Sequence, residues 1–372
     1  MRYRTALGAI GALPVVALIA ACGGAPAAPA SVQSSATGAP STATASPSAA
    51  PQPPVVLIAQ QASGTQTVLQ AKDPSGSPLW SVPYPSPGPY MVAAGPRLFE
   101  VDSKAKTVSV FDRSGRSIGN GSGAGEVFSS TSAEWAWSTV DGTNPSPAAN
   151  GSPVTVTGSF WVAGVGEAPH RVYQWTENDT ANSLDQAYDR LVEWSDQGLV
   201  SSQPPPWSGC ASGHQSGSFV VNPKTGARTD LDAISVVDVH DGLIVSAPKA
   251  ADTAQSIVLS GRTSFTWADT AAPSLQPKGA YISPDGSRVA VAMLNAGCNE
   301  QPEAQTAIIS VADHSVQYLS GAFAEGWLDD GNLVAQVAFD SSLPNPELDV
   351  VALDGTRHLV GSGRLVGVIR SS

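Results

Sequence analysis

The residues of this sequence that could do chemistry gather around two of its three cysteines. Cys210 and Cys298 each follow a glycine, and each lies twelve residues after a glycine that we place in a tight turn, Gly198 or Gly286. Thiolates bind zinc or oxidise to disulfides, so the pair predicts one of these two chemistries. The polar side chains that could converge with the cysteines are His214, Glu300 and Glu303.

The pattern around these cysteines favours a disulfide over a metal centre. No CxxC or HxxxH pair occurs, although such close ligand pairs are typical of zinc sites. An even pair of cysteines in an exported domain usually forms a disulfide, which requires Cα atoms within about 7 Å. We therefore expect a disulfide between Cys210 and Cys298, with two free buried thiols as the alternative, and neither a metal ion nor another cofactor.

Other side chains suited to a binding site lie in the same part of the sequence. Trp207 follows three prolines and could stack on a sugar or a peptide, or else fill its loop. Asp179 and Asp185 could coordinate calcium, but their spacing is not that of an EF-hand, and a solvated acidic loop is the simpler interpretation. G-x-S-x-G, P-loop and G-x-G-x-x-G motifs are absent, so we predict no catalytic residue. The candidates for a ligand-binding face are Trp207, His214, Glu300, Glu303, Asp179 and Asp185.

A repeated phrase surrounds these candidates. Its clearest copy is YISPDGSRVAVA at residues 281–292, two short apolar runs joined at Asp285-Gly286, where glycine permits the positive φ of a tight hairpin. Weaker copies place turn glycines at 198, 242 and 331, so the steps are 44, 44 and 45 residues. A period of this length built from strands is typical of a β-propeller.

About seven such units fit between residues 55 and 370. Strands at 55–59, 67–71 and 79–83 begin the first unit, and the strand at 365–370, left over after the last unit, becomes its innermost strand. The other units run over 90–118, 127–175 (with an insertion at 141–153), 189–231, 234–267, 279–319 and 322–360. We therefore expect an all-β fold, a propeller of about seven four-stranded blades closed by pairing of its N- and C-terminal strands.

Residues 283–290, SPDGSRVA, resemble the S-P-D-G-x-x-[IV]-A repeat of TolB-type, WD-repeat-like bacterial propellers. The resemblance implies a propeller located in the cell envelope, over residues 55–372. The other copies, such as SDQGL and VHDGL, depart from the repeat. Because the repeated phrase is a structural turn, the resemblance implies no activity.

The first 54 residues indicate where the protein is located. Two arginines precede an apolar run at 6–21 that is too short for a comfortable membrane span, which is the pattern of a signal peptide. Residues 18–22, LIAAC, resemble the bacterial lipobox, which implies a lipid on Cys22; the alternative is an ordinary signal peptide in which Cys22 is incidental. We expect a signal peptide at 1–21, an Ala/Pro/Ser/Thr tether at 22–54, which could also be a glycosylated stalk, and the folded domain at 55–372.

Charge and composition limit the partners of the domain. The formal net charge of −12 argues against binding of a nucleic-acid backbone by the domain as a whole. Lysine is scarce, which fits a GC-rich genome. Together with the resemblance above, this suggests that the protein comes from an actinobacterium. We expect a monomer held on the outer face of the cytoplasmic membrane by its lipid.

The lengths of the units suggest that one face carries the binding residues. From the turn glycine to the third strand, the fourth and sixth units need about twenty-one residues, whereas the fifth needs about fifteen. These residues lie on the face opposite the Asp-Gly hairpins, and long loops on a rigid scaffold often carry binding residues, although neutral drift of loop length is an alternative.

Two functions from different classes fit these observations. The first is a non-enzymatic binding or scaffolding lipoprotein that holds a protein or a cell-envelope glycan on the long-loop face. The alternative is a hydrolase or lactonase-like enzyme with acidic residues at the central channel. A structural spacer is a third possibility. We favour binding because catalytic motifs are absent; carboxylates and histidines lining the channel on the long-loop face would contradict it.

Overall fold

The computed structural model describes residues 52–370, apart from 62–65, 85–88, 145–153, 180–189, 203–216, 234, 249–255, 270–274, 296–302 and 338–342. Contacts divide the chain into one compact unit at Ala50–Ser372 and a segment at Met1–Ala49, which lies outside the described residues. The described part contains strands β1 to β28 and no helix, so it has no helix that could cross a membrane. The predicted all-β fold is confirmed.

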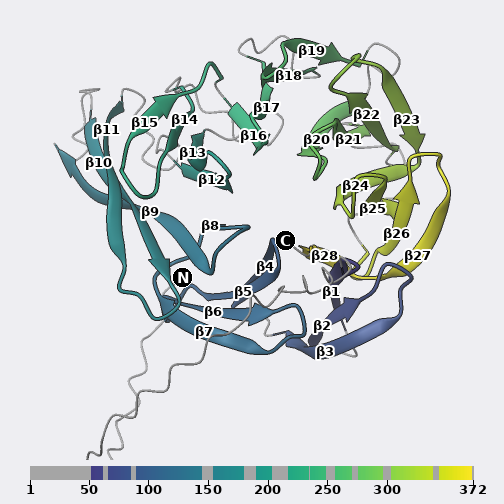
Figure 1. The fold of residues 1–372 in the computed structure, drawn as a ribbon, viewed down its shortest axis with the longest axis horizontal. Coiled ribbons are helices and arrows are strands. Elements are labelled where there is room, and N and C mark those ends of the chain that lie inside the picture. Colours follow the sequence, from purple (N-terminus) through teal and green to yellow (C-terminus); the bar gives the residue numbers. More distant parts are fainter. Residues whose placement is uncertain are drawn as a thin grey trace, which may run out of the picture. The chain divides into compact units, whose positions relative to one another are not determined.

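The strands form seven antiparallel sheets of four strands each, arranged around a centre (Figure 1). We number these sheets as blades in chain order and give their strands from the innermost outward. Blade 1 contains β28 (Arg364–Ile369), β1 (Val55–Gln61), β2 (Thr67–Lys72) and β3 (Pro78–Tyr84). Blade 2 contains β4 (Tyr90–Ala94), β5 (Arg97–Asp102), β6 (Thr107–Asp112) and β7 (Ser117–Ser122). Blade 3 contains β8 (Val127–Phe128), β9 (Glu134–Asn144), β10 (Val154–Gly164) and β11 (His170–Asp179).

The remaining four blades follow the same order. Blade 4 contains β12 (Arg190–Ser195), β13 (Gly198–Ser202), β14 (Phe219–Val221) and β15 (Arg228–Asp230). Blade 5 contains β16 (Ser235–His240), β17 (Leu243–Ala247), β18 (Ser256–Gly261) and β19 (Phe265–Ala268). Blade 6 contains β20 (Leu275–Ile282), β21 (Arg288–Asn295), β22 (Ala304–Ser310) and β23 (Val316–Ser320). Blade 7 contains β24 (Ala322–Trp327), β25 (Asn332–Val337), β26 (Glu347–Ala352) and β27 (Arg357–Ser362).

The two ends of the domain close the ring as predicted. β28 pairs antiparallel with β1, from Val55 opposite Ile369 to Ala59 opposite Arg364. The C-terminal strand is therefore the innermost strand of blade 1, although it begins and ends one residue earlier than the sequence pattern indicated. This pairing satisfies a strand edge of β1 that would otherwise be open.

The turns that defined the repeat are hairpins between the first and second strand of a blade. In blade 5, Asp241 and Gly242 both have positive φ (47° and 70°), as a two-residue type I′ turn requires. In blade 6, Gly286 also has positive φ, 65°, and its N–H donates to the carbonyl of Ser283. The sequence pattern therefore located these hairpins correctly.

A second family of turns joins the third and fourth strands of a blade. In four blades an aspartate carboxylate at this turn accepts the backbone N–H of the residue two positions later, at distances of 2.8 to 3.2 Å. Such local hydrogen bonds favour a turn over a continuing strand. The four residues are Asp73, Asp112, Asp313 and Asp354.

The hydrophobic core lies between the blades. It consists of seven clusters, and each cluster combines residues from two neighbouring blades, so that one cluster fills each junction of the ring. Large buried side chains such as Trp135, Phe160 and Trp327 contribute to these junctions. Alternating strand residues supply both faces of each blade, which explains the apolar runs of the sequence.

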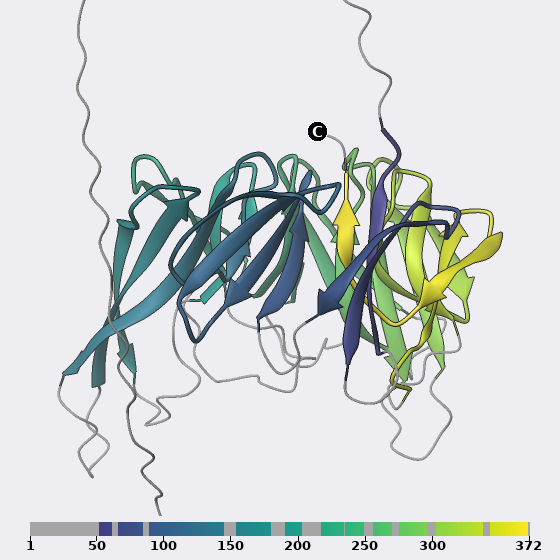
Figure 2. The same ribbon diagram turned by 90° about the horizontal axis from the view of Figure 1, so that it is seen from below.

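Blade 3 differs from the prediction in one respect. The sequence pattern placed an insertion at 141–153, but β9 continues to Asn144 and β10 begins at Val154. Part of the presumed insertion therefore lengthens a hairpin, because its alternating residues continue the β9–β10 ladder. Figure 2 shows β9, β10 and β11 projecting beyond the other blades, on the face opposite the short hairpins.

The lengths of the connections confirm a difference between the two faces. The hairpins on one face (first to second and third to fourth strands) have at most six residues, as between β14 and β15. On the other face the connection from β13 to β14 has sixteen residues, 203–218. We call this second face the long-connection face.

One length prediction was wrong. The connections from β17 to β18 (248–255) and from β21 to β22 (296–303) both have eight residues, so blade 6 carries no longer connection than blade 5. The additional residues of blade 6 lie in its strands, since β21 has eight residues whereas β17 has five.

Candidate functional site

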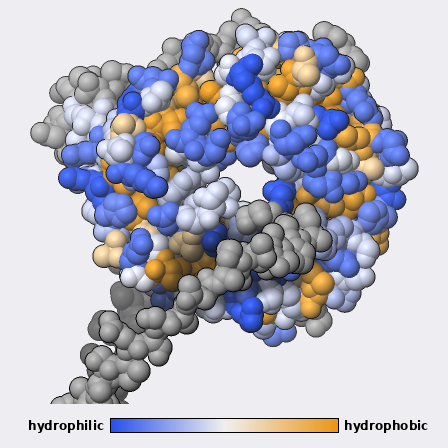
Figure 3. Space-filling model, in the orientation of Figure 1, coloured by the Kyte–Doolittle hydropathy of each residue, from blue (hydrophilic) through white to orange (hydrophobic). Residues whose placement is uncertain are grey.

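The innermost strands of the seven blades surround a central channel. Figure 3 shows its opening on the hairpin face, bordered mainly by hydrophilic residues. Because every innermost strand ends at this face, polar residues near the ends of these strands lie close to the opening. The channel is the place where residues from all blades can converge.

Five consecutive innermost strands, from blade 4 round to blade 1, contain a β-bulge. In each, the register with the second strand shifts, and one residue is left without a partner. A bulge redirects side chains and often accompanies a functional site. The unpaired residues are Val192, Val237, Lys278, Glu325 and Val366.

Two carboxylates directly follow such bulges and join neighbouring blades. The Glu193 carboxylate of β12 accepts the backbone N–H of Val239 in blade 5, at 2.8 Å. The Asp238 carboxylate of β16 accepts the N–H of Ile282 in blade 6, at 2.6 Å. Both residues are partly exposed, but their carboxyl groups are enclosed by protein atoms. The same device therefore links three successive blades.

Enclosure changes the acidity of these groups. Burial raises the pKa of Asp238 to about 6, although the N–H of Ile282 and the charges of His240 and Arg370 oppose the shift. Burial and the neighbouring Asp238 charge raise the pKa of Glu193 well above its usual value. Carboxylates with raised pKa at a channel have the acidity that acid–base chemistry needs.

Two further polar residues extend this cluster round the channel. Burial raises the pKa of Glu325 on β24, whose carboxylate accepts a hydrogen bond from the Gln336 amide. Burial, together with the charges of Glu325 and Asp238, also raises the pKa of Tyr281 on β20. The carbonyl of Tyr281 accepts the indole N–H of Trp327 at 2.8 Å, which joins blades 6 and 7.

Arg370 completes the links between blades beside the C-terminal strand. Its backbone N–H donates to the carbonyl of Gly95 in blade 2 at 3.0 Å. Its guanidinium donates to the carbonyls of Trp327 and Leu328 in blade 7. A single residue therefore connects blade 1 to both of its neighbours.

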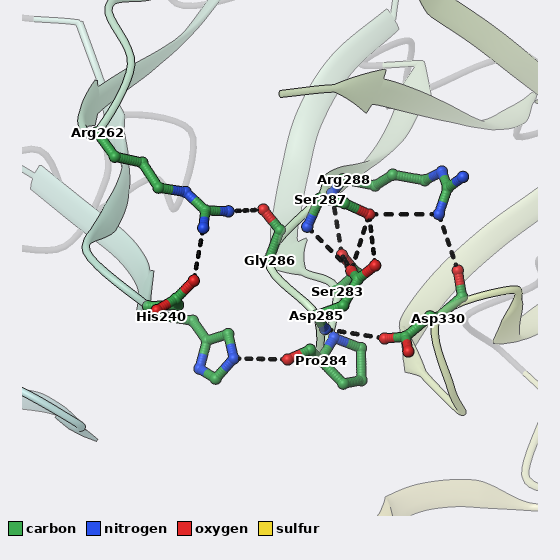
Figure 4. A network of polar contacts seen from close by, with 10 residues as sticks. His240, Arg262, Ser283, Pro284, Asp285, Gly286, Ser287, Arg288 and Asp330 are labelled. Carbon is green, nitrogen blue, oxygen red and sulfur yellow. Dashed lines mark hydrogen bonds and ion pairs between the residues drawn. The ribbon is translucent and has the colours of Figure 1, made fainter. Parts of the chain in front are cut away.

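The hairpins beside the channel are joined by a second polar network (Figure 4). The ring of His240 donates to the carbonyl of Pro284 at 2.8 Å, from blade 5 to blade 6. The backbone N–H of Asp285 donates to the carboxylate of Asp330 at 2.8 Å, from blade 6 to blade 7. Arg262 contacts both the carboxylate of Asp241 and the carbonyl of Gly286. The Asp-Gly turns thus take part in the contacts that join blades 5, 6 and 7.

At the long-connection face the innermost strands carry different residues. None of their first residues is an aspartate, a glutamate or a histidine, so the enclosed carboxylates lie nearer the hairpin face. A cluster of carboxylates at this mouth, which would contradict a binding function, is therefore not formed by the ends of these strands. Their first residues are Tyr90, Val127, Arg190, Ser235, Leu275, Ala322 and Arg364.

The structure locates only two of the residues that the sequence singled out. Asp179 is the last residue of β11 in blade 3, opposite Val154. Glu303 is exposed beside β22 in blade 6, and its carbonyl accepts the N–H of Asn295 at 3.2 Å. Blades 3 and 6 are not neighbours, so these two positions lie in separate parts of the ring. The other residues lie outside the described residues: Cys22, Asp185, Trp207, Cys210, His214, Cys298 and Glu300.

The disulfide between Cys210 and Cys298 stays a prediction. The equal offset from the turn glycines no longer indicates equivalent positions, because Cys298 is the third residue after β21 whereas Cys210 is the eighth after β13. As for metal, no group of three or more His, Cys, Asp or Glu side chains within the described ranges is placed to hold an ion.

Sequence reasoning missed the enclosed carboxylates and Arg370. A signal was present, since Glu193 and Asp238 interrupt apolar runs shortly before the turn glycines Gly198 and Gly242. A charged residue in the innermost strand of two successive repeats is unusual enough to mark a buried role. The pattern alone does not reveal which backbone N–H of the next blade each carboxylate meets.

Comparisons with known proteins extend the description of the fold. No protein-family model matches the sequence, and no curated protein matches it significantly. A solved prolyl endopeptidase is similar over 82% of this chain and 47% of its own, with 10% identity and a TM-score of 0.51. Acylaminoacyl peptidase of Pyrococcus horikoshii is similar over 82% of this chain and 50% of its own (13% identity, TM-score 0.48).

Oligogalacturonate lyase of Vibrio parahaemolyticus is also similar, over 84% of this chain and 86% of its own, with 11% identity and a TM-score of 0.43. The chain spans about half the length of the two peptidases. At such low identity these likenesses concern the fold alone. Together with the seven four-stranded sheets, the likeness to the prolyl endopeptidase shows that the described part of the chain is a seven-bladed β-propeller.

Proposed function

We propose that this chain is an extracytoplasmic lipoprotein whose propeller binds a protein or a cell-envelope glycan on its long-connection face, without catalysis. It is anchored through Cys22 to the outer face of the cytoplasmic membrane. The signal-peptide pattern and the lipobox-like LIAAC at residues 18–22 support the anchor. The scaffold and the connections described above support the binding role.

One observation carries the choice of binding over catalysis. Two of the three carboxylates beside the channel that have raised pKa values are engaged in joining the blades. Glu193 and Asp238 each hold a backbone N–H of the next blade at 2.6 to 2.8 Å. A carboxylate held in this way stabilises a blade junction, and leaving that N–H unpaired would cost about 1–3 kcal/mol.

The difference between the two faces supports the location of the binding surface. Connections of up to sixteen residues stand on one face, whereas the hairpins of the other face have at most six residues and bond to one another. Long connections on a rigid ring are suited to recognition, because the scaffold positions them while their sequences are free to vary.

A binding experiment tests this proposal directly. The full chain in detergent is mixed with purified peptidoglycan sacculi and, separately, with envelope proteins, and the bound fraction is measured. Replacing residues 203–218 of blade 4 by the four-residue connection 103–106 of blade 2 should lower binding about tenfold or more. In the control, residues 353–356 on the hairpin face are replaced by the sequence of residues 113–116, a turn of equal length on the same face. This variant should bind as the wild type does. Equal binding by all three proteins would contradict the proposal.

The anchor is tested separately with Cys22→Ser. The wild-type chain should incorporate labelled fatty acid and sediment with membranes, whereas the variant should incorporate none and move to the soluble fraction. A variant that still incorporates the label would show that Cys22 is not the lipidated residue.

A hydrolase or lactonase-like enzyme is the second candidate, and Asp238 is the observation that favours it. A carboxyl group with a pKa of about 6 beside a channel can act as a general base near neutral pH. The enzyme is tested by incubating the full chain with a panel of lactones and esters. Turnover that disappears in Asp238→Asn, while the variant stays folded, would replace binding by catalysis as the function.

A further inference from the structure

Blade 3 lacks most of its innermost strand. β8 has two residues, whereas the innermost strands of the other six blades have five to eight. β8 pairs only with Trp135 and Ala136, although β9 continues for eight more residues, to Asn144. Beyond Ala136, no strand of the described chain pairs with the channel-side edge of β9.

The route of the chain between blades 2 and 3 explains this gap. Only residues 123–126 connect β7 to β8, and Gly123 lies against the indole of Trp137, where a Cβ would come within 2.5 Å of the ring. The chain therefore crosses over Trp137 and enters the sheet part of the way along β9. The uncovered part of β9 extends toward the long-connection face (Figure 2).

A side chain already replaces the absent strand at one position. The Glu126 carboxylate accepts the backbone N–H of Ser138 at 3.0 Å and its hydroxyl at 2.8 Å. Backbone groups that point to one edge of a strand recur at every second residue. The N–H and C=O of Val140 therefore point to the same edge, where no partner is found among the described residues. Val140 is 50% exposed.

Carboxylates stand on both sides of Val140. Glu126 and Asp141 are exposed, and Asp141 is held in place because its carboxylate accepts the hydroxyls of Thr139 and Ser159. Asp141 is also the extra residue of a bulge in the β9–β10 ladder, so it ends the regular edge. The chain as a whole has a net charge of −12. An occupant that carries a positive charge would therefore be attracted to this edge.

We propose that an extended polypeptide segment with a lysine or arginine side chain pairs with β9 at Val140 and completes the innermost strand of blade 3. Addition of a strand to an open sheet edge is a common mode of peptide recognition, in which backbone hydrogen bonds supply affinity. The inference rests on the proposed function and makes its partner a protein, not a glycan. Because the other innermost strands have five to eight residues and β8 has two, the segment supplies about four residues.

The probe is a fluorescein-labelled peptide, acetyl-Thr-Val-Lys-Val-Thr-amide, titrated against the full chain in detergent and followed by fluorescence anisotropy. Val140→Pro removes the edge N–H and should weaken binding about tenfold or more. Leu79→Pro is the matched control, because Leu79 is also 50% exposed and is the unpaired residue of a bulge in β3. It should bind the peptide as the wild type does.

Charge recognition is measured with a second peptide in which norleucine replaces lysine. The double variant Glu126→Gln with Asp141→Asn should bind the lysine peptide about fivefold more weakly and the norleucine peptide unchanged. If Val140→Pro does not fold, amide hydrogen exchange of the wild type tests the same contact. The peptide should slow exchange of the Val140 amide and leave exchange of the Leu79 amide unchanged.

Two outcomes would overturn the inference. One is that the wild type does not bind the peptide at about 1 mM. The other is that the peptide binds, but Val140→Pro does not weaken this binding and the peptide does not slow hydrogen exchange at Val140. If envelope proteins or sacculi still bind the full chain and are lost on shortening 203–218 but not in Val140→Pro, the proposed function stands and this edge is not the site.

Discussion

At the scale of single residues, the enclosed carboxylates decide how the channel should be interpreted. Glu193 and Asp238 have the burial and the raised pKa of functional acids, yet each accepts a backbone N–H from the next blade. Perturbed acidity marks functional sites and structural networks alike. The hydrogen-bond partner of the carboxylate separates a structural network from a functional site, and here that partner is the backbone of a neighbouring blade.

The acidity of Asp238 leads to a prediction about pH. Burial raises its pKa from 3.8 to about 6, so the folded state binds the proton more tightly than the unfolded state. The resulting stability is present below pH 3.8 and is lost as pH rises through 6, by at most about 3 kcal/mol. Asp238→Asn keeps an oxygen for the N–H of Ile282 and should remove this loss. Urea unfolding of the wild type and of Asp238→Asn at several pH values between 4 and 7.5 measures this loss. The same pH dependence of the free energy of unfolding in both proteins would contradict the prediction.

At the scale of elements, blade 3 shows how packing across a sheet depends on one small residue. Gly158 on β10 lies opposite Trp175 of β11 and Val140 of β9. A Cβ at this glycine would come within 2.1 Å of the Trp175 ring and 2.3 Å of the Thr139 carbonyl. The indole of Trp175, a residue that is 3% exposed, therefore occupies the space that a side chain at Gly158 would need.

Gly158→Ala should accordingly destabilise the domain by about 1–3 kcal/mol, since neither the indole nor the carbonyl can move without disturbing the β10 ladder. The matched control is Gly142→Ala on β9, where the nearest atom to a new Cβ would be 3.6 Å away. The free energy of unfolding in urea should decrease for Gly158→Ala alone. Equal stabilities of the two variants would show that Trp175 can rearrange.

At the scale of the whole molecule, the ring is held together at seven junctions, and the junctions on either side of blade 1 depend on the C-terminal strand. Val368 contributes to the cluster between blades 7 and 1, and Ile369 to the cluster between blades 1 and 2. Arg370 then bonds to blades 2 and 7. The last described residues thus close a ring that begins at Val55.

Removing residues 364–372 should therefore have a large effect. The truncated chain loses the partner of β1 and two buried apolar side chains, each of which contributes about 1.5–3 kcal/mol. We expect it to unfold at least about 4 kcal/mol more easily than the full chain, or not to fold cooperatively, as measured by circular dichroism in urea. Removing only residues 371–372 should have no effect, and similar unfolding of both truncated chains would argue against closure through β28.

A disulfide between Cys210 and Cys298 would add a connection between blades 4 and 6 across blade 5. Exported protein analysed by mass spectrometry without reduction should contain one peptide pair joined through these cysteines. Reduction should lower the free energy of unfolding by about 2–4 kcal/mol. Recovery of both cysteines as free thiols would refute the bond.

The sequence by itself determined that there are about seven blades, together with their approximate limits and the closure of the ring. These follow from local features: alternating apolar residues specify strands, and the glycines of Asp241-Gly242 and Asp285-Gly286 adopt the positive φ of hairpins. Only the tertiary structure decided that Glu193 and Asp238 bond to the next blade, that blade 6 has no longer connection than blade 5, and that no described strand pairs with the channel-side edge of β9 beside Val140. The physical reason is that bulges and strand ends depend on ladder register, and register between strands and blades is set by packing of residues distant in sequence.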